Sequence, residues 1–171
     1  LFKGYTMTDM IEVKETEVIE ITETELDVEE AEEVVIITAT LVPEEKRMEF
    51  LPKLIGDYPM AFERYVYQWM EKLTKGIYTG GLWEFYNLSN GGGYISFCGS
   101  KPFTMYSMNG AVCECSNETA SIVANIFALS SLMQSMDAKG LNCEVPSKRY
   151  YQLLDFAYGT PESAMIQALI D

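Results

Sequence analysis

The sequence predicts an α+β fold in which a meandering antiparallel sheet of about four to five strands has helices packed against it. Three observations support this class: an early β-branched segment, apolar residues at helical spacing after it, and then several short β-rich segments separated by turns. Strands that follow one another through short turns must be antiparallel. The expected order is one strand, two helices, four strands and two or three closing helices.

The first half of the chain supplies one strand and two helices. Residues 34–41 are short and β-branched, which predicts a buried strand. A helix is expected over 44–54, because a proline precedes two glutamates there and carboxylates favour the positive end of the helix dipole. A second, amphipathic helix is expected over 61–74. Gly56 and Gly76 are placed to end these two helices.

Four short strands are expected in the middle of the chain. Their predicted ranges are 82–88, 93–98, 103–108 and 111–115. Residues 89–93 form the turn of the first pair, and Asn109-Gly110 is a strong signal for a tight hairpin turn between the last pair. This stretch therefore predicts two antiparallel hairpins that follow one another in the sheet.

The last third of the chain is expected to be helical. Ser116 or Asn117 caps a third helix, which carries a broad apolar stripe. Ser147 is expected to cap a fourth helix that runs through Phe156. A short terminal helix starts at residues 160–162, where a proline stands between a threonine and a glutamate.

The net charge of −14 is concentrated near the start of the chain. Residues 9–33 carry twelve carboxylates and one lysine, whereas residues 34–171 carry fourteen acids and ten bases. We expect residues 1–33 to be an acidic extension, with residues 1–6 resembling an expression-vector remnant, and residues 34–171 to be a single domain. The candidate contact residues of this arm are Glu17, Glu20, Glu23, Glu25, Glu29 and Glu30.

The acidic arm has three interpretations. A run of carboxylates commonly serves as a solubilising extension. It can also act as an adaptor for a basic partner, or imitate duplex DNA, which carries one charge per roughly 1.7 Å of axis. Mimicry needs acids spread over a long rigid surface, and here they are crowded into residues 9–33.

The composition excludes several classes of function. The chain has no histidine, the commonest general base and metal ligand, so no imidazole-dependent triad can form. No basic face indicates direct nucleic-acid binding. No apolar run approaches the roughly 20 residues that a membrane helix needs. We therefore expect a cytoplasmic protein with no cofactor, no metal and no catalytic residues.

The four cysteines are the remaining candidates for metal or redox chemistry. Cys113 and Cys115 alternate on a predicted strand and so share one face, and Cys98 and Cys143 would complete a set of four thiolates. The spacing does not match paired C-x-x-C motifs, which indicate zinc sites. Packing as small apolar groups is the simpler interpretation.

Residues 80–93 read GGLWEFYNLSNGGG, which is a strand, a glycine turn and the start of a returning strand. The glycines could cradle a phosphate, but the P-loop lysine and hydroxyl are missing and no helix follows, so a hairpin is the preferred interpretation. The aromatic cluster of Trp83, Phe85, Tyr86 and Tyr94 is expected to divide between the core and a contact surface.

The same run also resembles a known family. Together with LVPEEKRMEFLP at 41–52 and ASIVANIFAL at 120–129, it resembles the ArdB/KlcA group of bacterial antirestriction proteins, which are carried by plasmids and other mobile elements. The resemblance extends in the same order from about Thr38 to the C-terminus. Three ordered segments are more specific than any one of them.

The resemblance implies protection of mobile DNA by inhibition of host type I restriction-modification enzymes. It implies contact with a protein of the restriction complex rather than chemistry on DNA, and it transfers no catalytic residues. On the positions that match its motifs, the residues expected to matter most are Trp83, Tyr86, Asn87, Ser89, Asn90 and Gly91. Two rival hypotheses are the acidic adaptor acting through residues 9–33 and an enzyme centred on the Cys113–Cys115 pair.

Overall fold

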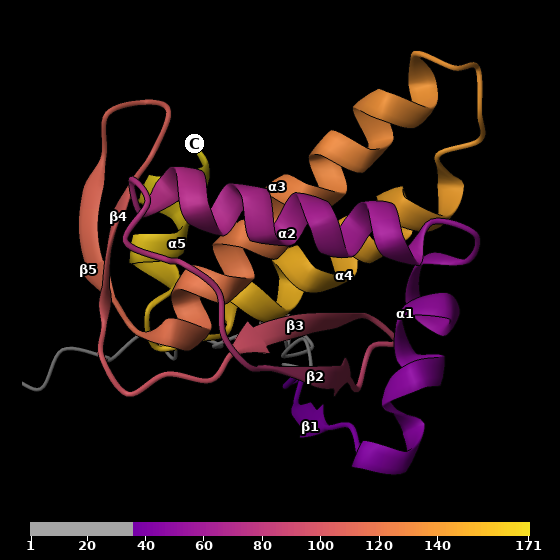
Figure 1. Ribbon diagram of the computed structural model, residues 1–171, viewed down its shortest axis with the longest axis horizontal. Helices are drawn as coiled ribbons and strands as arrows, with labels where there is room; N and C mark the ends of the chain where they lie inside the picture. The colour runs from indigo at the N-terminus through magenta and orange to yellow at the C-terminus, as the bar shows by residue number, and fades with distance from the viewer. Residues whose placement is uncertain (1–35) are drawn as a thin grey trace, which may run out of the picture. The chain divides into compact units, whose positions relative to one another are not determined.

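The computed structural model describes residues 36–171, so the acidic segment at residues 1–33 lies outside the described residues. The described part has helices and antiparallel strands, which confirms the α+β class (Figure 1). Its elements are β1 (Ala39–Leu41), η1 (Glu44–Lys46), α1 (Arg47–Ile55), α2 (Pro59–Leu73), β2 (Trp83–Leu88), β3 (Gly93–Phe97), β4 (Phe103–Tyr106), β5 (Val112–Cys115), α3 (Asn117–Asp137), α4 (Glu144–Tyr158) and α5 (Ser163–Ile170).

The strands form two sheets rather than the single meander that the sequence predicts. One sheet has the order β1-β2-β3, and β4 pairs only with β5. Both pairings in the first sheet are antiparallel, with Thr40 opposite Asn87 and Phe85 opposite Ile95. The expected hairpin turns are present, and Gly110 takes a φ of 91° in the second. The prediction was wrong only in joining the two hairpins through β3 and β4.

Helix α3 explains why β4 does not join the first sheet. The N–H of Ile95 donates to Asn125 Oδ1 (3.1 Å), and Asn125 Nδ2 donates back to the carbonyl of Ile95 (2.8 Å). The N–H of Phe97 donates to Ser121 Oγ (2.9 Å). These side chains occupy the outward-facing backbone groups of β3, where a further strand would otherwise pair.

Helix α3 runs through the middle of the described part and contacts α2, α4, α5 and β3 (Figure 1). It is apolar on nearly every side, as expected for a helix that is covered all round. Trp69 of α2 stacks on Phe127, with ring centroids 4.6 Å apart, and donates to Ser131 Oγ (2.8 Å). Within residues 36–171, α3 is the one helix long and apolar enough to cross a membrane, and 67 % of its most apolar stretch is buried inside the protein.

Most helix ends follow the sequence signals. Gly56 ends α1. Gly76 lies just beyond α2, and its N–H donates to the carbonyl of Glu71 in the last turns of that helix (2.8 Å). Ser116 caps α3, because its hydroxyl accepts the N–H of Thr119 (3.2 Å). The expected cap at Ser147 was wrong: α4 starts three residues earlier, at Glu144.

The early start of α4 has a local cause. The side chain of Asn142 accepts the N–H of Glu144 (2.7 Å), which satisfies one free donor at the start of the helix. The predicted strand at 34–41 is also shorter in the described part, since only Ala39–Leu41 pair with β2. Helix α2 begins at Pro59, two residues before the predicted start at residue 61.

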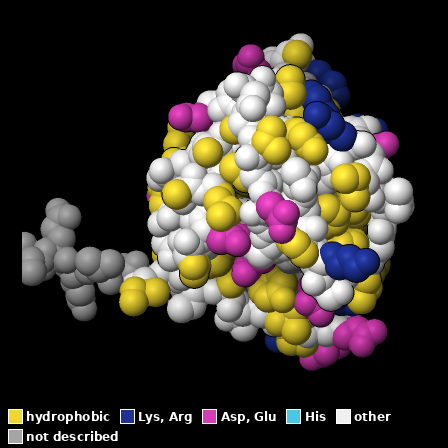
Figure 2. All heavy atoms as spheres, turned by 90° about the vertical axis from the view of Figure 1, so that its left-hand side faces the viewer, with side chains coloured by type: hydrophobic (Ala, Val, Ile, Leu, Met, Phe, Trp, Pro, Cys, Tyr) yellow, Lys and Arg dark blue, Asp and Glu magenta, His cyan; other side chains and the backbone are white. Residues whose placement is uncertain are grey.

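Figure 2 shows the side of the molecule on which β4, β5 and α5 lie. Hydrophobic side chains appear there in separate groups, with acidic and other polar atoms between them. This face therefore offers scattered apolar contacts rather than one continuous patch.

Candidate functional site

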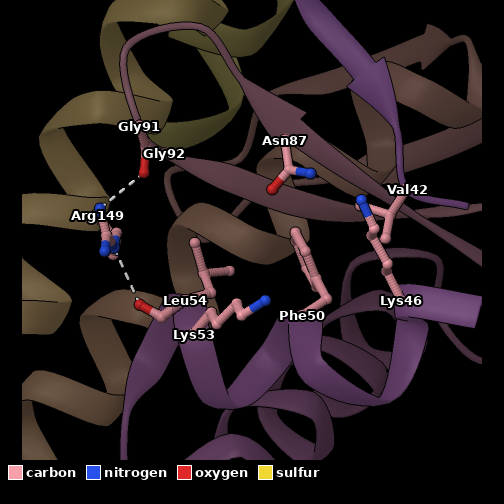
Figure 3. Close-up of a pocket in the computed structure, with 9 residues that line it drawn as sticks. All are labelled: Val42, Lys46, Phe50, Lys53, Leu54, Asn87, Gly91, Gly92 and Arg149. Atoms are coloured by element: carbon pink, nitrogen blue, oxygen red, sulfur yellow. Dashed lines mark hydrogen bonds between the residues drawn. The ribbon is translucent and has the colours of Figure 1, made fainter.

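A pocket of about 260 Å³ lies where the glycine turn between β2 and β3 meets α1 and α4 (Figure 3). Two of the segments that carry the family resemblance, 41–52 and 80–93, contribute most of its wall. The residues that line it are Val42, Lys46, Phe50, Lys53, Leu54, Asn87, Gly91, Gly92 and Arg149. The pocket is therefore the place where distant parts of the resemblance come together.

The glycine turn needs its glycines for steric reasons. Gly91 has a φ of 87°, in the left-handed region that side chains disfavour. At Gly93 a Cβ would lie 2.8 Å from the carbonyl oxygen of Tyr86 and 3.0 Å from the ring of Phe50. The turn closes through the N–H of Leu88, which donates to Gly92 (3.0 Å). The hairpin interpretation of this run is therefore confirmed.

Arg149 and Gln152 of α4 fasten this turn to the helices. The Arg149 guanidinium donates from Nη1 to the carbonyl of Gly91 (2.7 Å) and from Nε to the carbonyl of Leu54 at the end of α1 (2.9 Å). Gln152 donates to the carbonyl of Asn90, whose own amide donates to the carbonyl of Gln152 (2.8 Å). One arginine thus joins the glycine turn, α1 and α4 (Figure 3).

The charged residues that line the pocket are all basic, although residues 34–171 carry more acids than bases. Lys46, Lys53 and Arg149 line it, and none of its lining residues is acidic. Lys53 pairs with Glu49 one turn earlier in α1 (2.5 Å), and both side chains are largely exposed, at 72 % and 61 %. Water therefore screens the attraction between Lys53 and Glu49, because both side chains are largely exposed.

The structure places the predicted site residues in three environments. Trp83 is buried, and its Nε1 donates to the hydroxyl of Tyr78 (2.9 Å), so it belongs to the core. Ser89 accepts the N–H of Thr38 (3.0 Å) beside β1, and Asn90 and Gly91 belong to the fastened turn. Asn87 is exposed and lines the pocket.

Tyr86 belongs to a second polar cluster on the first sheet. Its ring stacks on Tyr94 with centroids 5.2 Å apart, and its hydroxyl donates to Glu84 (3.0 Å). The Tyr94 hydroxyl donates to Glu118 at the start of α3 (2.6 Å). Burial, and then the neighbouring carboxylate, raise the pKa of Tyr86 to about 12, and the same causes raise the pKa of Tyr94. Both hydroxyls are therefore held protonated as donors.

The aromatic cluster predicted from the sequence lies mostly in the core. Trp83 and Tyr94 are buried, whereas Phe85 and Tyr86 are partly buried. Phe85 stacks on Phe50 with centroids 5.3 Å apart. These rings hold the first sheet against α1, α2 and α4 rather than forming a wide exposed surface.

The cysteines are free thiols, and the described part of the chain has no group of three His, Cys, Asp or Glu residues able to hold a metal. Cys115 is buried, and burial raises its pKa to about 12. Such a thiol is protonated near neutral pH and is a poor nucleophile. The six candidate residues of the acidic arm lie outside residues 36–171.

Sequence reasoning missed Arg149, Gln152 and the lysines of the pocket. Arg149 and Gln152 act through contacts with residues 58 to 95 positions away in the chain. Lys46 lies within the 41–52 segment that carries the family resemblance and Lys53 directly follows it, but nothing in that segment alone shows that these lysines share a pocket with Arg149. A partial signal was available at α3, where Ser121 and Asn125 are polar residues four apart in an apolar helix. Such a pair indicates buried hydrogen bonds to a neighbouring element.

The fold and the site define a small α+β protein with a basic surface pocket built on a glycine hairpin. The chain belongs to the antirestriction protein family, whose members match it over residues 77–171. Curated relatives extend the match. YafX of Escherichia coli K12 is 32 % identical over 140 residues, which cover 79 % of this chain and 88 % of YafX. The antirestriction protein KlcA of Escherichia coli is 36 % identical over 137 residues, covering 79 % of this chain and 95 % of KlcA.

A solved structure supports membership of the same family. It comes from a structural study of the KlcA and ArdB proteins, which describes a novel fold and antirestriction activity against type I DNA restriction systems in vivo but not in vitro. It matches this chain with a TM-score of 0.72 and 37 % identity, covering 79 % of this chain and 95 % of that one. The resemblance to the ArdB/KlcA group is therefore confirmed.

Proposed function

We propose that this protein protects mobile-element DNA by inhibiting host type I restriction-modification enzymes through protein–protein contact. The similarity to the KlcA and ArdB structure carries the proposal, because those proteins act against type I DNA restriction systems. At 37 % identity over nearly the whole of that chain, the two proteins share their fold. The cytoplasm, where such enzymes meet incoming DNA, is the expected place of action.

The chemistry of the chain supports inhibition by contact rather than catalysis. It has no histidine for proton transfer, and a raised pKa keeps the Cys115 thiol protonated. Among the predicted site residues, Ser89 and Asn90 bond backbone groups of neighbouring elements, and the carbonyl of Gly91 accepts from Arg149. Such bonds hold a surface in shape, as binding requires.

We assign different roles to the six candidate residues of the glycine run. Asn87 is exposed at the pocket and is the residue proposed to touch a partner. Trp83 and Tyr86 hold β2 against its neighbours, and Ser89, Asn90 and Gly91 hold the turn. The proposed domain is residues 34–171, preceded by the acidic extension.

The test of the function is a plating assay, since the activity of the KlcA and ArdB proteins was seen in vivo but not in vitro. Unmodified phage is plated on cells that carry a type I system, with and without this gene. We expect the gene to raise plating efficiency toward that of modified phage, which serves as the control. Unchanged restriction across several type I families contradicts the proposal.

The same assay separates the alternative function. If the acidic arm is an adaptor or DNA mimic, a chain lacking residues 7–33 loses protection. If the family domain acts, the shortened chain keeps it, provided that immunoblotting shows equal protein levels. A Cys113→Ser, Cys115→Ser double variant that still protects rules out the cysteine-centred enzyme.

A further inference from the structure

We propose that the pocket between the glycine turn, α1 and α4 is a binding site for a carboxylate side chain of an acidic peptide segment. The ligand is an anionic oxygen group carried on an apolar stem. The assignment of a protein as its source rests on the proposed function, because inhibition by contact needs a partner surface. The charges, the hydrogen bonds and the size of the pocket each support this ligand class.

The charge of the pocket is unusual for this chain. Three of the ten cationic side chains of residues 34–171 line it, although fourteen acids are spread over the same residues. Its lining includes no acidic residue. Charges of one sign that line a concave site focus the electrostatic potential, and positive charges there attract an anion.

The cations differ in how firmly they are held. Arg149 is fixed by bonds to Gly91, Leu54 and Gln152 that use Nε and Nη1, and within residues 36–171 its Nη2 makes no hydrogen bond. Lys46 is exposed and has no carboxylate within ion-pair distance in the same part of the chain. The pocket thus combines one positioned donor, Arg149, with two exposed lysines, of which Lys53 is paired with Glu49 and Lys46 is not. Charged donors of this kind suit binding of a carboxylate.

The remaining lining fits the stem of an acidic side chain. Val42, Phe50 and Leu54 are buried and supply apolar lining beside the basic side chains (Figure 3). The exposed amide of Asn87 offers a further donor. A ligand that carries methylene groups next to an anionic oxygen can use both parts of the pocket.

The size of the pocket favours a side chain over a nucleotide or a cofactor. Its volume of about 260 Å³ is below the range of roughly 300–1,000 Å³ for pockets that enclose small-molecule ligands. Duplex DNA needs several cations over a long face, and only three meet here. One or two residues of an acidic peptide match both the volume and the charge.

The proposal is tested by calorimetric titration of the purified full chain. The probe is a capped peptide that alternates leucine and glutamate; a glutamine counterpart, inorganic phosphate and a short DNA duplex are titrated in parallel. We compare a Lys46→Gln, Lys53→Gln variant with a Lys139→Gln, Lys148→Gln control, which removes the same charge from exposed lysines outside the pocket. Matching circular dichroism spectra establish that the variants fold.

We expect the acidic peptide to bind and the glutamine peptide not to bind. The pocket variant should weaken binding at least about tenfold, which corresponds to roughly 1.4 kcal/mol, while the control stays within about twofold. Equal weakening in both variants overturns the proposal, because it indicates general charge attraction. Binding of phosphate or DNA without binding of the acidic peptide overturns the ligand assignment.

Failure of this inference is distinguishable from failure of the proposed function. If the wild-type chain protects phage but binds no acidic peptide, the function stands and the pocket assignment is wrong. If the peptide binds at the pocket but the chain gives no protection, the pocket assignment stands and the antirestriction function is wrong.

Discussion

Arg149 has an effect on the structure that exceeds a single contact. Its bonds to the carbonyls of Gly91 and Leu54 satisfy one acceptor in a turn and another at the C-terminal end of a helix. Hydrogen bonds from a charged donor contribute about 1.5–3 kcal/mol each, more than neutral ones. Arg149 therefore both fixes the shape of the pocket and contributes positive charge to it.

At the residue scale, Gly93→Ala is the sharpest test of the turn. The new Cβ would meet the carbonyl of Tyr86 at 2.8 Å, and backbone cannot move aside as a flexible side chain can. We expect a loss of about 1–3 kcal/mol in the free energy of unfolding, typical of overpacking. Urea denaturation measures it.

The control for Gly93→Ala is Gly159→Ala. There a Cβ meets no atom closer than 3.5 Å, an ordinary contact, and the φ of −87° suits alanine. This variant should stay within about 0.5 kcal/mol of wild type. Equal stability of the two variants would contradict the close packing of Gly93.

At the scale of elements, helix α3 acts as the neighbour that completes the first sheet. Asn125 and Ser121 bond the outer edge of β3, so that edge is blocked to β4 and to other chains. The sequence segment at 120–129 that resembles the family contains both residues. Its role is thus to attach a helix to a sheet through the backbone rather than to form a contact surface.

The prediction at this scale concerns Asn125→Ala. The change leaves the buried N–H and carbonyl of Ile95 without partners, each at a cost of about 1–3 kcal/mol. We expect the free energy of unfolding to fall by about 2–4 kcal/mol, against less than about 0.5 kcal/mol for Gln134→Ala on an exposed position of α3. Amide hydrogen exchange should become faster at Ile95, and unchanged protection there would argue against the bond.

At the scale of the whole molecule, burial of tyrosine rings makes stability depend on alkaline pH. Burial is the largest cause of a raised pKa in five tyrosines of the described residues: Tyr67, Tyr78, Tyr86, Tyr94 and Tyr150. Four of the five belong to the aromatic packing around the first sheet: Tyr67, Tyr78, Tyr86 and Tyr94. Their hydroxyls resist ionisation in the folded state and ionise at ordinary pH in the unfolded state.

The free energy of unfolding should therefore decrease as the pH rises through the alkaline range. Because the pKa of Tyr86 is raised from 10.0 to about 12, its stabilising contribution is complete below pH 10 and is lost as the pH rises through about 12. We expect the urea midpoint to drop between pH 9 and pH 11.5, and to drop less in Tyr86→Phe. A midpoint that is constant over this interval would show that the rings are not held as the structure places them.

The sequence alone determined the α+β class, most helix ends, both hairpin turns and the family. These depend on local signals: periodicity, glycines, caps and ordered motifs. The tertiary structure alone decided the division into two sheets, because Asn125 and Ser121 occupy the edge of β3 from 24 to 30 residues away. It also decided the basic pocket, whose lysines and Arg149 come from segments about 100 residues apart. Contacts over such separations leave no periodic trace in one sequence.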